Sequence, residues 1–426
     1  MVTIKAMKAL LLFMISIFCF AMNHDYPHES MEMHGMYGSY PMGEDATGTS
    51  WVPASTRMPG IHWMPDQWLL MSHGLLMAIY DDQGGPRGGK KFFSENMFMV
   101  TAQKDFGDST FALRNMISIE PATIGCKGYP LLLQTGETCN GVTSLIDRQH
   151  PHDFLMELAA VYTYCFSREH SLFAYFGYPG EPALGPPAYI HRFSSFFNPE
   201  APITHHWLDS THIVFGVVTV GHVHDWLKID ASIFTGREPN QHRWNFDPPR
   251  FDSYSARLSI NPTENIAAQV SYGWIRSPEQ LESNVNTQRT TASISYNKAW
   301  EANNWQITTA WGLNSNSPGH NLNAYLLESA IEINNRHVFF GRAEYAAKDR
   351  LFVPPNPNAT KVFDIGKLDL GYLFEIPLVP YTLWGVGFVG SASFVPHSIK
   401  SAYGGTPLSY MAFLRIELKD RGSSQN

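Results

Sequence analysis

Apolar residues recur at every second position through most of the chain, from residue 64 to residue 418. The stretch from Ile266 to Trp274 shows the pattern well, because one face carries Ile266, Ala268, Val270, Tyr272 and Trp274 and the other carries Ala267, Gln269, Ser271 and Gly273. The same alternation runs through residues 227–233, 254–260, 339–348 and 367–375. A period of two predicts β-strands with one apolar and one polar face, whereas a helix would need a period of about 3.6.

The connections between these strands indicate which all-β fold they form. Sixteen runs fall near residues 66–80, 92–104, 109–120, 152–166, 171–178, 211–222, 226–236, 253–261, 266–276, 288–297, 304–313, 324–333, 336–348, 361–375, 382–395 and 407–418. Long links rich in Gly and Pro alternate with short ones, as outer-membrane barrels alternate external loops with periplasmic turns. A soluble β-protein also shows a period of two, so the lengths of the links must distinguish it from a membrane barrel. They favour a transmembrane antiparallel β-barrel of about sixteen strands over residues 64–418.

The two ends of the chain differ from this pattern. Residues 1–21 are predicted to be a signal peptide, because Lys5 and Lys8 precede an apolar run and a cleavage site of small residues. Residues 22–63 are expected to form a flexible periplasmic leader, and residues 419–426 a polar tail. After the signal, no apolar stretch reaches roughly 18 residues, which excludes a helical membrane protein.

Charge and cysteine content narrow the expected partners. Loss of Lys5 and Lys8 with the signal takes the formal net charge from −8 to −10, which argues against nucleic acid as a partner. We expect contact with outer-membrane lipid and with a small solute or metal ion, and the oligomeric state is left open. Export favours oxidation, and Cys126 and Cys139 flank one loop, so these two cysteines are predicted to form a disulfide.

The leader has an unusual composition. Methionine and histidine recur within a short span, and the candidate ligands are His24, His28, Met31, Met33, His34, Met36 and Met42. Thioether and imidazole donors together suit copper, especially Cu(I), better than hard cations. The segment has no core-forming periodicity and is expected to be disordered without a ligand. The alternative interpretation is a flexible leader with no metal.

Two further motifs gather histidines and carboxylates in external loops. One is the segment 147–153 and the other is the segment 205–212, with one more histidine between them. Their candidate metal ligands are His150, His152, Asp153, His191, His205, His206, Asp209 and His212. Both motifs flank strands that start on the external side, so they could converge over the barrel mouth as a metal site. The alternative is that these groups hydrogen-bond to one another and hold the loops folded.

The longest loop, residues 179–210, is expected to fold toward the lumen and narrow it. Sixteen strands leave a water-filled interior unless something plugs it. The polar positions of the alternating strands give the candidate pore-lining residues Lys228, Asp230, Arg257, Glu328, Glu332, Arg342, Glu344, Lys367 and Asp369. Such charges either set a field across the pore or pair and stiffen the wall. No nucleophile motif with a positioned base is present, so the chain is not expected to be an enzyme.

Several short stretches resemble a known family. Residues 82–89, 128–138, 147–153, 180–187, 205–212 and 341–345 are similar to a largely uncharacterised family of bacterial outer-membrane β-barrels associated with copper-handling genes. The resemblance spans most of residues 50–418 and implies a barrel, but it brings no catalytic residues. The Met/His leader is similar to that of CopB-type copper-resistance outer-membrane proteins.

Together these features predict a protein of the bacterial outer membrane that acts as a porin-like channel or receptor in copper or other metal handling. No cofactor is required, and a copper ion is a candidate ligand. A TonB-independent receptor for a metal chelate or small ligand, and a structural or adhesive barrel, remain as alternatives.

Overall fold

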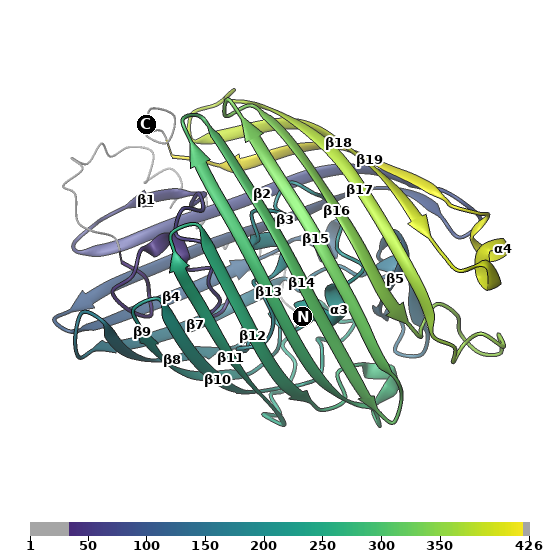
Figure 1. Cartoon of the computed structure of the whole chain (residues 1–426), viewed down its shortest axis with the longest axis horizontal. Coiled ribbons are helices and arrows are strands. Elements are labelled where there is room, and N and C mark those ends of the chain that lie inside the picture. The colour runs from purple at the N-terminus through teal and green to yellow at the C-terminus, as the bar shows by residue number, and fades with distance from the viewer. Residues whose placement is uncertain (1–33, 421–426) are drawn as a thin grey trace.

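The computed structural model describes residues 34–420, and in it sixteen antiparallel strands close into a barrel (Figure 1). The strands are β2 (Trp68–Gln83), β3 (Gly89–Phe106), β4 (Ser109–Ile117), β7 (Leu155–Cys165), β8 (His170–Gly177), β9 (Val217–His224), β10 (Leu227–Phe234), β11 (Ser253–Thr263), β12 (Ile266–Ile275), β13 (Asn286–Trp300), β14 (Asn303–Ser317), β15 (Asn321–Ile333), β16 (His337–Lys348), β17 (Phe363–Ile376), β18 (Thr382–Phe394) and β19 (Leu408–Leu418). The last strand pairs with β2, with Phe413 opposite Ile79, which closes the ring. Each neighbour is the next barrel strand along the chain, so the predicted fold is confirmed.

The remaining elements are short and are not strands of this ring. Strand β1 (Ile61–Trp63) pairs with the first residues of β2, and a separate hairpin is formed by β5 (Tyr129–Thr138) and β6 (Ser144–Gln149). The helices are single turns, namely α2 (Glu120–Thr123), α3 (His205–Leu208) and α4 (Lys400–Tyr403), with 3-10 turns at Met42–Glu44, Tyr189–His191, Ser210–His212, Gln280–Glu282 and His397–Ile399. No helix among the described residues is long and apolar enough to cross a membrane.

The period of two determines which side chains face the lumen. On β10, Lys228 and Asp230 point inward and are buried, whereas Ile229 between them points outward and is 55% exposed. Outward apolar side chains form a band around the barrel that includes Leu172, Val220, Ile229, Leu258, Val270, Leu327, Leu370, Val386 and Leu414. Such a band is the lipid-contacting surface of a membrane barrel. The architecture is that of bacterial outer-membrane proteins and places the chain in that membrane.

The links differ from expectation in two places. Strand β2 ends at Gln83 and β3 begins at Gly89, so the external link between them is short rather than long. The external link between β14 and β15 is also short and consists of residues 318–320. The strict long–short alternation was therefore wrong there, because the strands continue beyond the apolar band. The remaining links keep the rule, and we call the end with the turns 107–108, 166–169 and 225–226 the periplasmic end.

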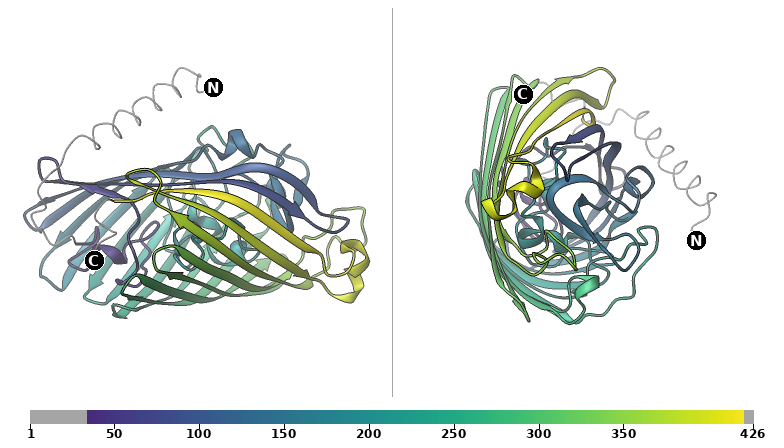
Figure 2. Two further views of the ribbon diagram at one scale, coloured as in Figure 1. Left: turned by 90° about the horizontal axis from the view of Figure 1, so that it is seen from above. Right: turned by 90° about the vertical axis from the view of Figure 1, so that its right-hand side faces the viewer.

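The interior of the barrel is filled by its own chain. Figure 2 (right) looks along the barrel from the end that carries α4, and ribbons of chain lie inside the ring of strands. Three segments contribute buried side chains there: residues 34–60, the β5–β6 hairpin, and residues 178–216, which we call the inner loop. The inner loop thus fills the lumen rather than only narrowing it.

Two expectations about these segments need correction. The leader was predicted as a flexible segment over residues 22–63, but residues 34–60 pack in the lumen, where Tyr37 is fully buried and its hydroxyl donates to the Gly48 carbonyl at 2.6 Å. Their partners are far away in sequence, which explains why local periodicity did not reveal them. The segment 121–151 was expected to be a loop, but it holds the β5–β6 hairpin. Residues 1–33 and 421–426 lie outside the described residues, including the predicted signal peptide.

The predicted disulfide is confirmed. Cys126 and Cys139 are bonded, 13 residues apart, and they bracket strand β5. Cys165 at the end of β7 is a free, half-buried thiol.

The lipid-facing assignment can be tested with a charge on the outer wall. Val270 lies in the middle of β12, opposite Leu258 and Ala292, and its side chain is 48% exposed. We expect Val270→Arg to destabilise the barrel in phospholipid vesicles, lowering its free energy of unfolding by about 2–4 kcal/mol, because a cation near the bilayer midplane is poorly solvated. Val270→Leu is the matched control, and equal stabilities of the two variants would contradict the assignment.

Candidate functional site: a methionine and histidine cavity in the lumen

The predicted pore-lining residues all point into the barrel and are buried. Their charges are used within the protein, because a buried charge is costly unless it is paired. Asp230 pairs with Arg257 at 2.9 Å, Glu332 pairs with Arg57 at 3.3 Å, and Lys367 pairs with Glu200. Lys228 lies with its Nζ 4.0 Å from the centre of the Trp51 ring. These charges therefore do not line an open aqueous path across the described lumen.

Most of these pairs join the barrel wall to the segments that fill it. Arg192 of the inner loop is fully buried and contacts Asp209 at 2.7 Å and Glu328 of β15 at 2.7 Å. Arg342 also reaches Glu328, at 3.3 Å, and lies 3.8 Å from Asp369. Glu344 accepts hydrogen bonds from the backbone N–H (3.0 Å) and hydroxyl (2.7 Å) of Thr204. The wall charges thus anchor the inner loop.

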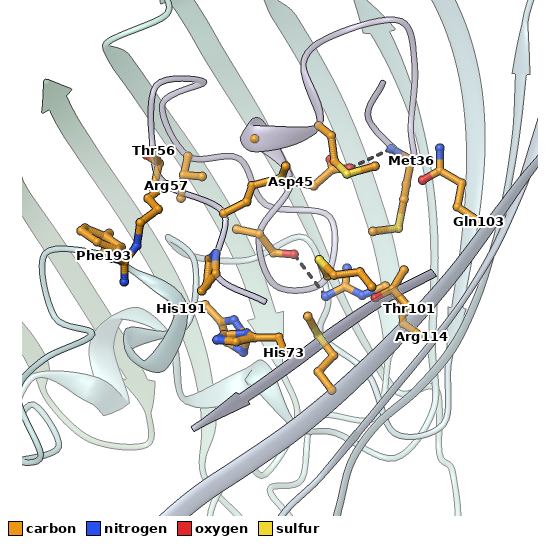
Figure 3. Close-up of a pocket in the computed structure, with 18 of the residues that line it drawn as sticks. Met36, Asp45, Thr56, Arg57, His73, Thr101, Gln103, Arg114, His191 and Phe193 are labelled. Carbon is orange, nitrogen blue, oxygen red and sulfur yellow. Dashed lines mark hydrogen bonds between the residues drawn. The ribbon is translucent and has the colours of Figure 1, made fainter. Parts of the chain in front are cut away.

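Between the inner loop and the strands remains a cavity of about 90 Å³ (Figure 3). Its sulfur and imidazole lining comes from the leader, from β2 and β3, and from the inner loop, and comprises Met36, Met42, Met58, Met71, Met99, His73 and His191. In Figure 3, the rings of His73 and His191 lie side by side at the cavity wall. Their centroids are 5.8 Å apart. This volume exceeds what one water molecule needs, so a small ion can enter with part of its hydration shell.

The charged groups beside this cavity already have partners. Arg57 contacts Glu332 and Glu417, and Arg114 contacts Glu157 at 3.2 Å. Asp45 accepts from the Met36 N–H at 2.7 Å and from the Tyr40 hydroxyl at 2.6 Å.

By contrast, the two imidazoles in the cavity are free to bind. The Nε2 atoms of His73 and His191 are buried and have no hydrogen-bond partner among the described residues. His73 itself is only 3% exposed. The groups still available to a ligand thus include two imidazole nitrogens and the methionine sulfurs, together with the unpartnered oxygens Thr101 Oγ1 and Gln103 Oε1.

Methionines continue from this cavity along one side of the barrel wall. Met97, Met99, Met116 and Met156 form one buried cluster with Met71 packed against it. Strand register explains the grouping, since Met99 lies opposite both His73 and Met116. A second cavity of about 30 Å³ borders the same cluster and is lined by Met77, Met97, Met156 and His152 among others. We call these residues of β2, β3, β4 and β7 the methionine wall.

The two predicted histidine motifs converge above this second cavity. The rings of His152 and His212 are 5.4 Å apart, and those of His205 and His212 are 5.1 Å apart. His152 Nδ1 contacts Glu120 at 2.9 Å, and His205 Nδ1 contacts Asp209 at 2.8 Å. The predicted convergence is thus present inside the barrel. His212 Nδ1 likewise contacts the Asp209 carbonyl at 2.8 Å, so each of these three histidines uses its Nδ1 to hold the loops together.

The other predicted ligands in these motifs are distributed more widely. Asp153 pairs with Arg243 at 2.8 Å, and His150 Nδ1 accepts from the Glu137 N–H at 3.2 Å. The ring centroid of His206 lies 5.7 Å from that of His205, and its Nε2 has no hydrogen-bond partner among the described residues. Burial lowers the pKa of His206 to about 3 and holds the pKa of His212 well below its usual value, so both rings are neutral at neutral pH.

Of the metal ligands predicted in the leader, some line the cavity and one is used in a contact within the protein. Met36 and Met42 line the cavity, whereas His34 Nε2 contacts Asp105 at 2.9 Å, at the last residues of β3. His24, His28, Met31 and Met33 lie outside the described residues.

Sequence reasoning missed four of the methionines and histidines that line the cavity: Met58, Met71, His73 and Met99. Their spacing in the sequence could have revealed some of them. Met71 and His73 are two residues apart on one predicted strand, so they must share a face, and the same holds for Met97 and Met99 on the next strand. An inward methionine otherwise looks like ordinary core filling.

Comparison with known proteins supports the fold. No protein-family model and no curated protein matches the chain. Among solved structures, OmpF of Salmonella typhi in complex with daunomycin is 9% identical, with a TM-score of 0.52 over 84% of this chain and 100% of its own. An anion-selective porin from Comamonas acidovorans is 8% identical (TM-score 0.47, 82% and 100%), and the outer membrane channel DcaP of Acinetobacter baumannii is 9% identical (TM-score 0.45, 85% and 100%). The chain has a porin-like fold.

The role of Arg192 in holding the inner loop can be tested by measuring ion conductance through the protein in planar bilayers. Arg192→Ala leaves Glu328 and Asp209 with one cation fewer, which should destabilise the docked loop by about 3–5 kcal/mol. We expect the wild-type protein to conduct poorly in planar bilayers and the variant to show larger and noisier openings. The exposed Arg168→Ala on a periplasmic turn is the control. Equal conductance of all three proteins would show that Arg192 does not hold the lumen closed.

Proposed function

We propose that this porin-like barrel is a selective outer-membrane passage for soft metal ions, with Cu(I) as the expected cargo. The observation that carries the proposal is the cavity in the lumen, where five methionine sulfurs and two unpartnered imidazoles share about 90 Å³. An open barrel of this size would let hydrated solutes through. Here the remaining space is lined by methionine and histidine side chains, which favour soft metal ions over hard ones.

The donor set favours a soft ion over a hard one. Thioether sulfur binds Cu(I) well and binds Mg²⁺ or Ca²⁺ poorly, because hard cations require carboxylate or carbonyl oxygens. The carboxylate of Asp45 at the cavity is occupied by two hydrogen bonds, and Glu332 and Glu417 are paired with Arg57. The positive charge of Arg57 and Arg114 is likewise neutralised by partners. A monovalent cation can therefore enter without displacing an ion pair.

The methionine wall supports passage rather than storage. It links the cavity to the second cavity and to His152, so sulfur and imidazole donors succeed one another along the lumen. Conduction requires several sites that each bind well enough to admit an ion and weakly enough to release it. A ladder of neutral thioethers meets this requirement. In the sequence, Met31 and Met33 come shortly before the described segment 34–60. The resemblance to copper-associated barrels agrees with the proposal.

One observation favours a second candidate, a receptor that binds a metal chelate or another small ligand without free passage. The inner loop is anchored by buried ion pairs around Arg192, and such a plug fits a binding protein as well as a gated channel. The two candidates differ in transport. Liposomes containing the protein should accumulate Cu(I) down a gradient if the passage is correct, and should only bind it at the surface if the receptor is correct.

The cavity itself is tested by removing sulfur at constant bulk. Met71→Leu with Met99→Leu, made in a protein whose Met31 and Met33 are already Leu, should lower Cu(I) affinity by at least about tenfold, because leucine keeps the volume but offers no donor. Affinity is measured by competition with a Cu(I) chelator under reducing conditions. Met411→Leu in the same background is the matched control, since Met411 faces the lumen outside this cavity. Unchanged affinity in the Met71/Met99 variant would remove the cavity from the proposal.

A further inference from the structure

A second group of potential ligands lies on the outer wall of the barrel, at its periplasmic end. His170 is the first residue of β8, His224 is the last residue of β9, and His222 lies two residues before His224 on the same face of the strand. The ladder places His170 directly opposite His224, and Leu172 opposite His222. All three side chains share the outward face, because Leu172 and Val220 on the same face are exposed and Ser171 and Val223 between them are buried. The cluster lies where the apolar band gives way to the periplasm.

The donor atoms of this cluster are close together. One ligand atom from each of Glu169, His170 and His224 lies within 4.8 Å of the other two. His170 Nδ1 is also 3.2 Å from His222 Nε2. Among the described residues, Glu169, His170 and His224 are the one group of three or more His, Cys or carboxylate side chains that meets this spacing.

The ordinary explanation for these rings is an interfacial aromatic belt. Phe166 stacks on His170 with ring centroids 5.4 Å apart, and His170 stacks on His224 at 4.2 Å. Aromatic side chains commonly occupy the boundary between lipid and water. A belt, however, uses the ring faces and gives no reason for three imidazoles and a carboxylate at one point. Imidazolium rings at this spacing would repel one another, whereas a bound cation would join them.

We propose that Glu169, His170, His222 and His224 form a binding site for a borderline divalent metal ion of the Zn²⁺ class. Imidazole nitrogen with one carboxylate oxygen is a donor set that such ions prefer, and tetrahedral ligands at about 2.0–2.1 Å from Zn²⁺ lie roughly 3.4 Å apart. Small side-chain rotations would cover the remaining distance, because Glu169 and His224 are exposed. The β8–β9 ladder fixes the backbone positions of the ligands.

This site is independent of the proposed passage for soft ions. It lies on the outside of the wall, so an ion bound there neither enters nor leaves the lumen cavity. It lacks methionine and combines nitrogen with oxygen, so it selects a different class of ion from the cavity. A metal bound here would link β8 to β9 at the end where the barrel meets the periplasm.

The experiment is a Zn²⁺ titration of the purified full-length protein in detergent, followed by calorimetry. His170→Phe with His224→Phe keeps the stacked aromatic rings but removes two nitrogen donors. We expect the wild-type protein and a leader variant, His24→Ala with His28→Ala, to bind one Zn²⁺ at this site, and the Phe variant to lose that binding. Faster migration of unboiled protein on gels checks that each variant is folded.

Equal Zn²⁺ binding by the wild-type and the Phe variant would overturn the proposal and leave the cluster as an aromatic belt. Loss of binding only in the leader variant would also overturn it, by assigning the metal to the leader. Should the double variant fold poorly, the single variant His222→Phe gives the same decision, with weaker Zn²⁺ binding expected and unchanged binding contradicting the site. Loss of Cu(I) binding at the lumen cavity would leave these results unaffected, so the two proposals can fail separately.

Discussion

A closed sheet of sixteen strands encloses more space than its own side chains can fill. This protein fills the space with backbone from three segments, and buried backbone needs hydrogen-bond partners. The lumen-wall cations supply them. Arg114 donates to the Gly48 carbonyl at 2.8 Å, Arg342 to the Glu200 carbonyl at 2.6 Å, and Lys348 to the Leu133 carbonyl at 2.8 Å. The charged residues on the lumen face of the strands thus hold the inner segments in place.

The lumen face of the barrel wall has two chemically different parts, one with many charged side chains and one rich in methionine. Strands β15 to β17 carry the ionic anchors, of which Glu328, Arg342 and Lys367 are central. Strands β2, β3, β4 and β7 carry the methionine wall, and the cavities remain on that side. A thioether cannot satisfy a backbone N–H or neutralise an arginine well, so a methionine-rich wall leaves its donors uncommitted. Arg114 of β4 anchors the segment 34–60 on this side as well, but the methionine wall around it leaves its sulfur atoms available to a soft ion.

The strands could be predicted because their pattern is local, whereas the contents of the lumen could not. Lys228 and Asp230 were placed on the inner face by alternation alone, since one residue in two must point inward. That Asp230 contacts Thr49 depends on two segments 181 residues apart. No periodicity marks residues 34–60 as ordered, because their partners lie on distant strands. In the cavity, Met36, Met42 and His191 were suspected from composition, while Met71, His73 and Met99 were hidden among inward apolar positions.

The claim that the lumen holds a soft-metal site is tested most directly by anomalous X-ray diffraction from crystals loaded with Cu(I) under reducing conditions. Data collected on both sides of the copper absorption edge locate the ion without reference to activity. The account predicts an anomalous peak inside the cavity, within bonding distance of His73 or His191 and of at least one sulfur of Met71 or Met99. Fully loaded crystals whose copper peaks all lie outside the lumen, with an unoccupied cavity, would contradict it.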